Sequence, residues 1–449
     1  MNKPWHLDSW KSFPAMQQPD YEDTAALNEV LLELRQQPPL VFAGEVRDLK
    51  DRLAKVATGE MFLLQGGDCA EQFSQNHAKI IREKLRILLQ MAIVLTYGSL
   101  KPVVKVGRIA GQYAKPRTKP MEVVKGQEMH AYRGDSVNQL VAGVAGRKPD
   151  PNRLLRAYHQ SASTLNLLRA FTHGGYADLA MVSAWNLDFV KGSRLGDEYE
   201  ELSNEIHRTL RFIQACGMDS TKFPQLHQVD LFTSHEALLL GYESALTRKD
   251  SLTQDWYNCG AHMVWIGDRT RQLDGAHVEY MRGIHNPIGM KVGPSIETDE
   301  LKRLIEVLNP KNEAGRLVLI TRFGADKIED HLPGLIGAVR ETGLSVVWSC
   351  DPMHGNTFKV DSGHKTRHFE NILKELTSFF AIHKAEGTVP GGVHFELTGA
   401  NVTECLGGLE DIKIEELPKS YETACDPRLN AVQSLEMAFR IADLLREHG

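Results

Sequence analysis

Short apolar runs recur along this chain, and most of them end in a charged or metal-capable residue. Strand-like runs start near residues 61, 102, 229, 262, 288, 317, 345 and 393, and most of the gaps between them have helical spacing. Eight alternating strand and helix units favour a closed α/β barrel, the (β/α)8 or TIM barrel, over an open doubly wound sheet. Because active sites of such barrels lie at the carboxyl ends of the strands, charged residues at the ends of these runs indicate an enzyme.

Two segments fall outside this eightfold pattern. Residues 1–58 contain five prolines around a helical stretch over 24–37, and we predict an N-terminal extension that packs on the barrel or on a partner subunit. The catalytic barrel is expected over 59–449. The gap between the second and third runs spans about 110 residues, too long for one crossover helix, and helical spacing over 151–172 and 197–216 predicts an insertion. We expect its inserted helices at about 187–225, either as a subunit contact or regulatory surface or as a cover for the barrel flank.

Composition narrows the class of protein. The 449 residues are 42% apolar and 24% charged, with a formal net charge of −6. This balance indicates a folded protein without the basic footprint of nucleic-acid or anionic-membrane binding. The N-terminus lacks an apolar signal region and no apolar run is long enough to span a membrane, so we expect a cytoplasmic protein. Six scattered cysteines without CxxC spacing indicate reduced thiols, and no GxGxxG follows a predicted strand to support a dinucleotide site.

Metal-capable residues fall at three predicted strand ends: Cys69, His354 and Glu396. Asp426, in the loop after the last strand, would supply a fourth ligand. A thiolate, an imidazole and carboxylates suit a divalent transition metal such as Mn, Co, Fe or Zn better than Mg or Ca. Singly, a cysteine after a strand is more often a small buried side chain than a ligand. Over 393–398, however, polar and apolar residues alternate, so one polar face lies inside the predicted barrel, where a site is expected.

Cations also end predicted strands. The four are Arg108, Arg269, Lys291 and Arg322. A net-acidic protein that directs four cations at one barrel mouth is expected to bind a phosphate or carboxylate there. The alternative is that these cations pair with neighbouring acids such as Asp268 or Asp326.

The segment 107–118 continues this cationic theme in a loop. Its glycines permit close backbone approach, Pro116 stiffens the loop, and Lys115, Arg117 and Thr118 offer donors to a phosphate. A solvated basic loop is the alternative interpretation. Two anion sites beside one metal would suit an enzyme that joins two phosphorylated small molecules.

Long motifs then give a resemblance that covers nearly the whole chain. They are Gly66–Glu71, Gly107–Thr118, Tyr132–Asp135, Trp265–His277, Asn286–Pro294, Asp351–Thr357, Gly391–Gly399 and Cys425–Asn430. In these motifs the chain resembles the type II 3-deoxy-D-arabino-heptulosonate 7-phosphate (DAHP) synthases, the first enzymes of the shikimate pathway. The motifs are long and occur in the same order, which argues against a chance match.

The resemblance implies a transferase that forms a C–C bond by an aldol-like condensation of phosphoenolpyruvate with D-erythrose 4-phosphate and water, releasing phosphate. By that match, the metal ligands are Cys69, His354, Glu396 and Asp426. The phosphoenolpyruvate residues are Arg108, Trp265, Asp268, Arg269, Lys291 and Arg322. The erythrose 4-phosphate residues are Lys115, Pro116, Arg117 and Thr118. Lys291, His354 and Asp268 are the candidate catalytic residues, although many relatives have Glu where this chain has Asp268.

The resemblance also implies partners. The expected metal is Mn²⁺ or Co²⁺, with Fe²⁺, Zn²⁺ or Cd²⁺ as alternatives. We expect a homo-oligomer, either a dimer or a tetramer, feedback inhibition by an aromatic amino acid with tryptophan favoured, and chorismate mutase as a candidate partner. A weaker hypothesis is that Cys425 oxidises with Cys69 when the metal is absent.

Two other functions stay open at this stage. One is another metal-dependent barrel that condenses phosphoenolpyruvate with a different sugar, such as an octulosonate synthase. The other is a non-catalytic barrel that serves as a scaffold, against which the retention of every proposed ligand and anion-binding residue argues.

Overall fold

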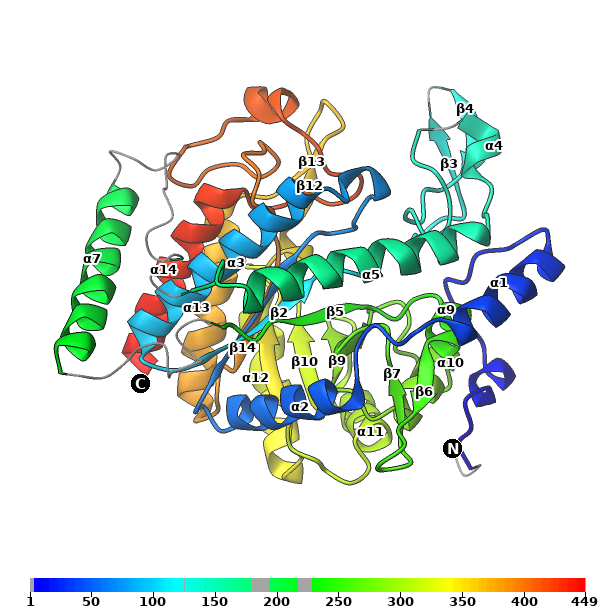
Figure 1. The fold of residues 1–449 in the computed structure, drawn as a ribbon, viewed down its shortest axis with the longest axis horizontal. Helices are drawn as coiled ribbons and strands as arrows, with labels where there is room; N and C mark the ends of the chain where they lie inside the picture. The colour runs from blue at the N-terminus through cyan, green and yellow to red at the C-terminus, as the bar shows by residue number, and fades with distance from the viewer. Residues whose placement is uncertain are drawn as a thin grey trace.

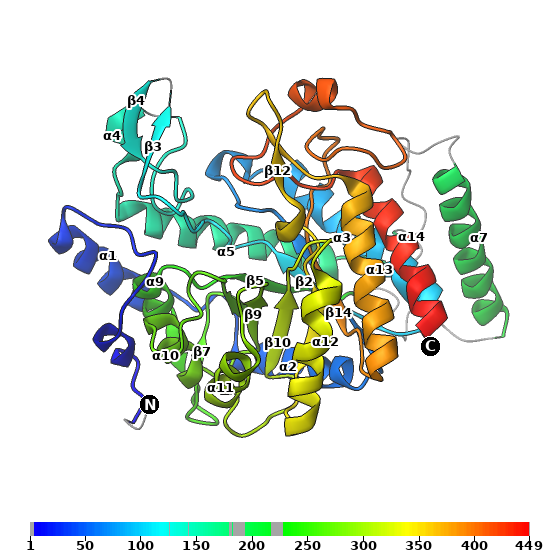
Figure 2. The ribbon, with the colours of Figure 1, turned by 180° about the vertical axis from the view of Figure 1, so that it is seen from behind.

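The computed structural model describes residues 4–124, 126–141, 143–178, 182, 194–216 and 228–448. Eight parallel strands close into a barrel in the order β1-β14-β11-β10-β9-β8-β5-β2, so strands that follow one another in the chain are neighbours (Figures 1 and 2). The strands are β1 (Phe62–Gly67), β2 (Val103–Arg108), β5 (Phe232–Glu236), β8 (Met263–Ile266), β9 (Ile288–Val292), β10 (Leu317–Thr321), β11 (Val347–Cys350) and β14 (Gly392–Glu396). The predicted (β/α)8 fold is therefore confirmed.

Helices surround the barrel. They include α3 (Ala78–Ser99), α5 (Asn152–His173), α9 (Leu240–Ala245), α10 (Ala276–Gly283), α11 (Thr298–Leu308), α12 (Ile328–Thr342), α13 (Phe369–Glu386) and α14 (Ala431–His448). Helix α11 shows why these segments are helical, because Leu301, Leu304, Ile305 and Leu308 are buried at the spacing of a single helix face. Its acidic first turn, which contains Asp299, also complements the helix dipole. Among the described residues, no helix is both long and apolar enough to cross a membrane.

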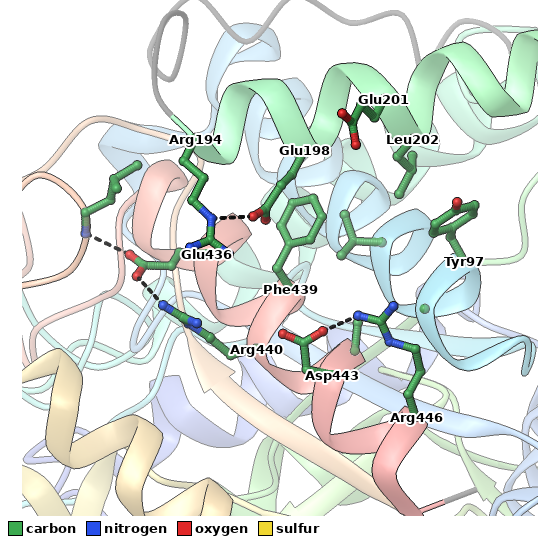
Figure 3. Close-up of a pocket in the computed structure, with 14 residues that line it drawn as sticks. Tyr97, Arg194, Glu198, Glu201, Leu202, Glu436, Phe439, Arg440, Asp443 and Arg446 are labelled. Atoms are coloured by element: carbon green, nitrogen blue, oxygen red, sulfur yellow. Dashed lines mark hydrogen bonds and ion pairs between the residues drawn. The ribbon is translucent and has the colours of Figure 1, made fainter.

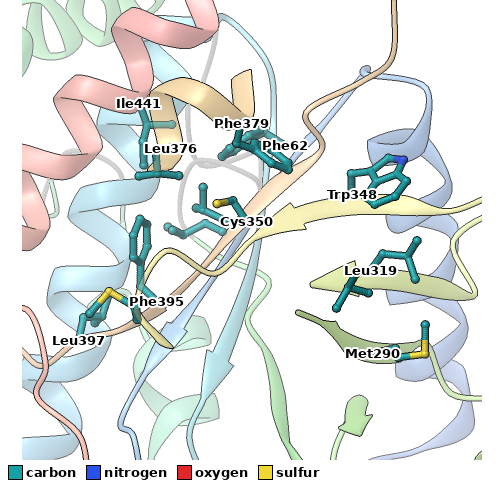
Figure 4. Packing of buried hydrophobic residues seen from close by; sticks show 14 of the residues in the cluster. Phe62, Met290, Leu319, Trp348, Cys350, Leu376, Phe379, Phe395, Leu397 and Ile441 are labelled. Atoms are coloured by element: carbon teal, nitrogen blue, oxygen red, sulfur yellow. The ribbon is translucent and has the colours of Figure 1, made fainter. Parts of the chain in front are cut away.

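The core has two layers. Outward-facing strand residues pack against the helices, as Phe395 and Cys350 do near Leu376 and Phe379 (Figure 4). Inward-facing residues in the lower half of the barrel, such as Val318, form a second apolar cluster. The alternation along each strand thus separates a helix-facing layer from the barrel interior.

The N-terminal extension closes the bottom of the barrel. Helix α2 (Ala43–Ala57) places Leu49, Leu53 and Val56 in the same cluster as the first inward residues of the strands. Helix α1 (Thr24–Gln36) packs instead on α5 and α9. The helix predicted over 24–37 is confirmed by α1.

The insertion after β2 supplies an arm and two long helices. The arm consists of the hairpin β3 (Met121–Val124) and β4 (Gln127–His130) with α4 (Gly143–Arg147), and it projects away from the barrel (Figure 1). The predicted helices over 151–172 and 197–216 correspond to α5 and α7 (Arg194–Ala215). The stretches 187–193 and 217–225 of the predicted insertion lie outside the described residues.

Several short elements also lie in the described part of the chain. They are the two-stranded sheets β6 (Thr247–Lys249) with β7 (Trp256–Asn258) and β12 (Phe358–Lys359) with β13 (Lys365–Thr366), and the 3-10 helices η1 (Ser9–Ser12), η2 (Phe73–Gln75), η4 (His354–Asn356) and η5 (Ile414–Lys419).

Candidate active site

A pocket opens at the carboxyl ends of the barrel strands. It is lined by Cys69, Arg108, Gln112, Lys115, Pro116, Glu236, Trp265, Gly267, Asp268, Arg269, Lys291, Arg322, His354 and Asp426. Eleven of the fourteen residues predicted for the site from the sequence are in this lining. Glu396 lies at the same end of the barrel and touches the lining residues, whereas Arg117 and Thr118 lie beside the pocket.

The four predicted metal ligands meet at one edge of this pocket. Single ligand atoms of Cys69, Glu396 and Asp426 all lie within 4.8 Å of one another. His354 joins them, because its Nε2 is 3.2 Å from Glu396 Oε1. The Lys115 ammonium lies among these donors, 2.8 Å from Cys69 Sγ and 2.6 Å from Asp426 Oδ2, so a cation is strongly stabilised at this position. The mixed thiol, imidazole and carboxylate set fits a divalent transition metal.

A glycine lets the backbone just before Cys69, a predicted metal ligand, pass close to the backbone of Arg108. Gly67 ends β1 with a φ of 147°, and a Cβ atom there would collide with the backbone carbonyl of Arg108. Without a side chain, the β1 backbone can pass against β2 just before Cys69. The position is restricted to glycine by this close approach.

Buried arginines hold Glu396. Arg367 Nη2 donates to Glu396 Oε2 at 2.8 Å, and Arg108 Nη2 donates to Oε1 at 3.1 Å. Burial would raise the pKa of the Glu396 carboxyl, but His354, Lys115 and Arg367 outweigh burial and hold that pKa well below its usual range. Glu396 is therefore a carboxylate at neutral pH, as a metal ligand must be.

Two lysines flank Asp426. Lys115 Nζ lies 2.6 Å from Oδ2 and Lys365 Nζ lies 2.7 Å from Oδ1. Burial raises the pKa of the Cys69 thiol well above its ordinary value, and a hydrogen bond with Cys425 acts in the same direction. Both cysteines are free thiols, and they lie close enough to interact.

Asp351 connects a predicted metal ligand, His354, with a predicted substrate-binding cation, Lys291. Its Oδ2 is 2.7 Å from His354 Nδ1 and also forms a short ion pair with Lys291 Nζ. Burial lowers the pKa of Lys291 to about 8, although the Asp351 carboxylate opposes that shift. The Asp351 carboxylate, whose pKa is held well below its usual range, fixes the orientation of both partners.

The strand-end cations do form partnerships with acids, as the alternative interpretation allowed. Arg322 Nη1 lies 3.2 Å from Asp268 Oδ2, and Arg108 contacts Glu396 as described above. Arg269 Nη2 donates to Thr118 Oγ1 at 3.1 Å, which joins the two predicted anion sites. All four cations nevertheless line the pocket.

The loop predicted to bind erythrose 4-phosphate is held from outside the barrel. Arg117 Nη2 lies 2.6 Å from Glu122 Oε2 in the arm, and the Arg117 backbone N–H donates to Gln17 Oε1 at 2.8 Å. The predicted loop thus contacts the N-terminal extension as well as the arm.

Several site residues were missed from the sequence. Glu236 lines the pocket, and burial raises the pKa of its carboxyl although the surrounding cations oppose this. Glu236 ends β5, so the strand-end rule could have identified it. Arg367 and Lys365 lie outside the strand-end runs, and no sequence signal points to them.

The chain is similar in sequence to a known protein family and to two individual relatives. The model of the class-II DAHP synthetase family matches residues 5–442. The phospho-2-dehydro-3-deoxyheptonate aldolase of Streptomyces coelicolor is 57% identical over 440 residues, covering 98% of this chain and 97% of that relative. The phospho-2-dehydro-3-deoxyheptonate aldolase AroG of Mycolicibacterium smegmatis is 49% identical over 446 residues, covering 98% of this chain and 95% of the relative.

Similarity to a solved structure is weaker. A truncated 3-deoxy-D-arabino-heptulosonate 7-phosphate synthase from Thermotoga maritima covers 86% of this chain and 85% of its own, with 13% identity and a TM-score of 0.31.

Proposed function

The chain belongs to the class-II DAHP synthetase family, and we propose that the pocket at its barrel mouth carries out that family's reaction. The resemblance found in the sequence is thereby confirmed. The protein is a DAHP synthase of the shikimate pathway, a transferase that forms a C–C bond. Its reaction joins C3 of phosphoenolpyruvate to the aldehyde carbon of D-erythrose 4-phosphate, water adds at C2, and inorganic phosphate leaves.

One observation carries the assignment of this reaction to the pocket. The Cys69, Glu396 and Asp426 ligand atoms lie within 4.8 Å of one another, and Arg108 and Lys291 line the adjoining space. A metal donor set and a cationic anion site in one pocket are what a condensation of two phosphorylated substrates requires.

Cys69, His354, Glu396 and Asp426 would hold a divalent metal, with Mn²⁺ or Co²⁺ favoured. When bound, such an ion polarises the aldehyde oxygen of the sugar and makes its carbon electrophilic. The residues fit this role because two carboxylates, one imidazole and one thiol converge from separate strands and loops.

Four cations would bind the phosphate and carboxylate of phosphoenolpyruvate. They are Arg108, Arg269, Lys291 and Arg322, with Trp265 forming one wall. The Asp268 carboxylate lies 3.2 Å from Arg322 and 3.2 Å from Arg271, so it would preorganise Arg322, and it lines the pocket beside the substrate as well.

Lys291 is the proposed proton donor to the developing sugar hydroxyl. Its pKa of about 8 suits a group that must lose and regain a proton near neutral pH. Asp351 keeps the ammonium and the His354 ring in place. The pocket-lining Glu236 is a second candidate for proton transfer, to or from the water that adds at C2.

Lys115, Pro116, Arg117 and Thr118 would bind erythrose 4-phosphate. The contact between Arg269 and Thr118 supports this proposal, because it joins the loop directly to one of the cations proposed to bind phosphoenolpyruvate. Two substrates held on adjoining surfaces are oriented for C–C bond formation.

A phosphate-release assay tests the function. Wild-type protein with both substrates is expected to release phosphate, and chelation should abolish this activity until Mn²⁺ or Co²⁺ is restored. Cys69→Ala should lower the rate of phosphate release at least 100-fold. Cys259→Ala, which changes another buried free thiol, should keep that rate within about threefold of wild type. Wild-type protein without metal-dependent release would overturn the proposal, and stronger activity with arabinose 5-phosphate would reassign the sugar.

We further propose feedback inhibition by an aromatic amino acid, with tryptophan favoured. A pocket between α3, the start of β2 and α7 has apolar walls that include Ile93 and Ile206. Its charged groups are Arg52, Lys101, Lys105 and Asp230, of which Arg52 and Asp230 form an ion pair at 2.6 Å. These groups match the carboxylate and ammonium of an amino acid, and the walls match its ring. The pocket between α3, α7 and α14 fits less well, because half of its lining residues are charged and several of them pair with one another, as Arg194 and Glu198 do at 2.7 Å (Figure 3).

Calorimetry with tryptophan, phenylalanine and tyrosine tests this inhibitor. Lys105→Met should weaken binding at least tenfold, whereas the exposed-side-chain control Lys55→Met should not. No binding of any of the three would contradict the proposal.

From the family resemblance we also propose a homo-oligomer, dimer or tetramer, a complex with chorismate mutase, and a cytoplasmic location. Sedimentation with and without chorismate mutase tests the first two.

A further inference from the structure

A buried polar network starts at the pocket-lining Arg108 and continues into the layer below the pocket. It runs across four neighbouring strands, from Arg108 on β2 through His394 on β14 and Gln65 on β1 to Ser234 on β5. The successive distances are 2.6 Å from Arg108 Nη1 to His394 Nε2, 2.8 Å from His394 Nδ1 to Gln65 Oε1, and 2.9 Å from Gln65 Nε2 to Ser234 Oγ. All four side chains are at most 2% exposed.

The direction of every hydrogen bond in this polar network is determined. A guanidinium has no acceptor, so Arg108 donates and His394 Nε2 must accept. The imidazole then carries its proton on Nδ1 and donates it to Gln65 Oε1, which turns the Gln65 amide so that Nε2 donates to Ser234. Ser234 Oγ in turn donates to the backbone carbonyl of Gly107 at 3.1 Å. Gly107 directly precedes Arg108, the first residue of the network.

Arg108 is almost completely committed to the protein. Its Nε donates to Asp68 O at 2.9 Å, and its Nη2 donates to Cys69 O at 3.2 Å and to Glu396 Oε1 at 3.1 Å. With the bond to His394, these contacts use four of the five guanidinium N–H groups. One N–H on Nη1 is left to face a ligand, and the Trp265 ring, 5.2 Å from the guanidinium carbon, covers one side.

We propose that His394, oriented by Gln65 and Ser234, is a positioning residue that fixes Arg108 so that its remaining N–H points at the anion of phosphoenolpyruvate. The inference rests on the proposed function of Arg108 as a phosphoenolpyruvate residue. His394 does not touch the substrate. It accepts from the same nitrogen that carries the free N–H, so it determines the direction of that group.

A purely structural role predicts different behaviour. If the polar network merely fills the barrel interior, its loss should lower stability and change the KM values for both substrates together. A positioning role predicts that only the KM for phosphoenolpyruvate rises. The rise should be larger the closer the substituted residue lies to Arg108.

The test is a graded series measured by initial-rate kinetics with each substrate varied. Ser234→Ala is expected to raise the KM for phosphoenolpyruvate about twofold, Gln65→Leu about fivefold, and His394→Leu at least tenfold. The KM for erythrose 4-phosphate and the bound metal, measured by elemental analysis, should stay within twofold of wild type. His394→Gln, whose carbonyl can accept and whose amide can donate, should restore the phosphoenolpyruvate KM to within threefold.

Val318→Ala is the matched control. Val318 faces the barrel interior below this layer, so its truncation should lower the melting temperature without changing the phosphoenolpyruvate KM. If His394→Leu does not fold, Gln65→Leu and His394→Gln still decide the question.

Active wild type with an unchanged phosphoenolpyruvate KM in His394→Leu or Gln65→Leu would overturn this inference alone. A parallel rise of the KM for both substrates would also overturn it. Wild type without turnover would overturn the proposed function, and this inference with it.

Discussion

Lys291 is a pocket residue whose charge is expected to control the affinity for phosphoenolpyruvate. Burial lowers the pKa of its ammonium from 10.5 to about 8, with Asp351 opposing and Arg108 adding to the shift. The ammonium is charged below that pKa, so its attraction for an anion is complete at pH 7 and is lost as the pH rises through about 8. We predict that phosphoenolpyruvate affinity falls at least tenfold between pH 7 and 9.5, measured by calorimetry on the metal-loaded protein.

Lys291→Arg separates this effect from other titrations. An arginine stays charged over the whole range, so the variant's phosphoenolpyruvate affinity, whatever its absolute value, should vary less than threefold from pH 7 to 9.5. Equal pH dependence in both proteins would assign the titration to another group.

At the scale of elements, α2 acts as the floor of the barrel. Its Leu53 is fully buried among the first inward residues of the strands, including Leu63 and Val104. Truncation to alanine removes this contact and leaves a cavity, so Leu53→Ala should lower the free energy of unfolding by about 2–5 kcal/mol. Urea unfolding measures the loss, and Lys55→Ala on the exposed face of α2 should change it by less than about 0.5 kcal/mol.

The position of α2 also sets the kinetics expected of Leu53→Ala. The floor and the pocket lie at opposite ends of the strands, so the folded variant should keep both KM values within about twofold. A large kinetic change at unchanged stability would contradict the separation of floor and site.

A second element-scale device joins the loops after β10 and β11. Glu375 on α13 accepts from the backbone N–H groups of Phe323 and Gly324, both at 2.9 Å, and from Asn356 Nδ2 at 2.7 Å. The loop after β10 begins with Arg322 and the loop after β11 contains His354, so one buried carboxyl group joins the loop of a proposed substrate-binding cation to the loop of a proposed metal ligand. Burial raises the pKa of Glu375 from 4.5 to about 8.

This raised pKa predicts a stability effect of definite sign. Between pH 4.5 and about 8 the folded protein keeps a proton that the unfolded chain has released, so the stability contribution of Glu375 is lost as the pH rises. Over that window the loss should be roughly 3–5 kcal/mol. Urea unfolding at several pH values should show a shallower decline in Glu375→Gln, and parallel curves for the two proteins would refute the assignment.

At the scale of the whole molecule, the barrel could be predicted because each of its strands is a local pattern. The apolar run before Arg322 and the polar face at His394 and Glu396 are visible within a few residues. The fold then brings the strand ends together, so residues such as Cys69 and His354 could be assigned to one site without knowledge of their contacts.

The missed residues are those whose role depends on contacts between distant segments. Arg367 reaches Glu396 from the segment between β13 and α13, and Gln17 reaches Arg117 across 100 residues. The arm that carries Glu122 was also missed, because its two short strands have only one buried residue and weak apolar patterning. Local periodicity contains no information on such pairings.

The N-terminal segment offers a test of one long-range connection. Trp5 donates from Nε1 to Glu279 O at 3.0 Å on α10, Gln18 binds Leu238 O at 2.8 Å, and the neighbouring Gln17 holds the Arg117 loop. A Cβ atom at Gly283 would overlap the Trp5 ring. Gly283→Ala should therefore displace the start of the segment and loosen the loop proposed to bind erythrose 4-phosphate.

We predict that Gly283→Ala raises the KM for erythrose 4-phosphate about three- to tenfold while the phosphoenolpyruvate KM stays within twofold, with a stability loss of about 1–3 kcal/mol. Trp5→Ala breaks the same anchor, so the double variant should be little worse than either single variant. Gly334→Ala on α12 is the control, since a Cβ there meets no atom within 4 Å. Additive effects, or a wild-type erythrose 4-phosphate KM in Gly283→Ala, would show that the extension and the substrate loop are independent.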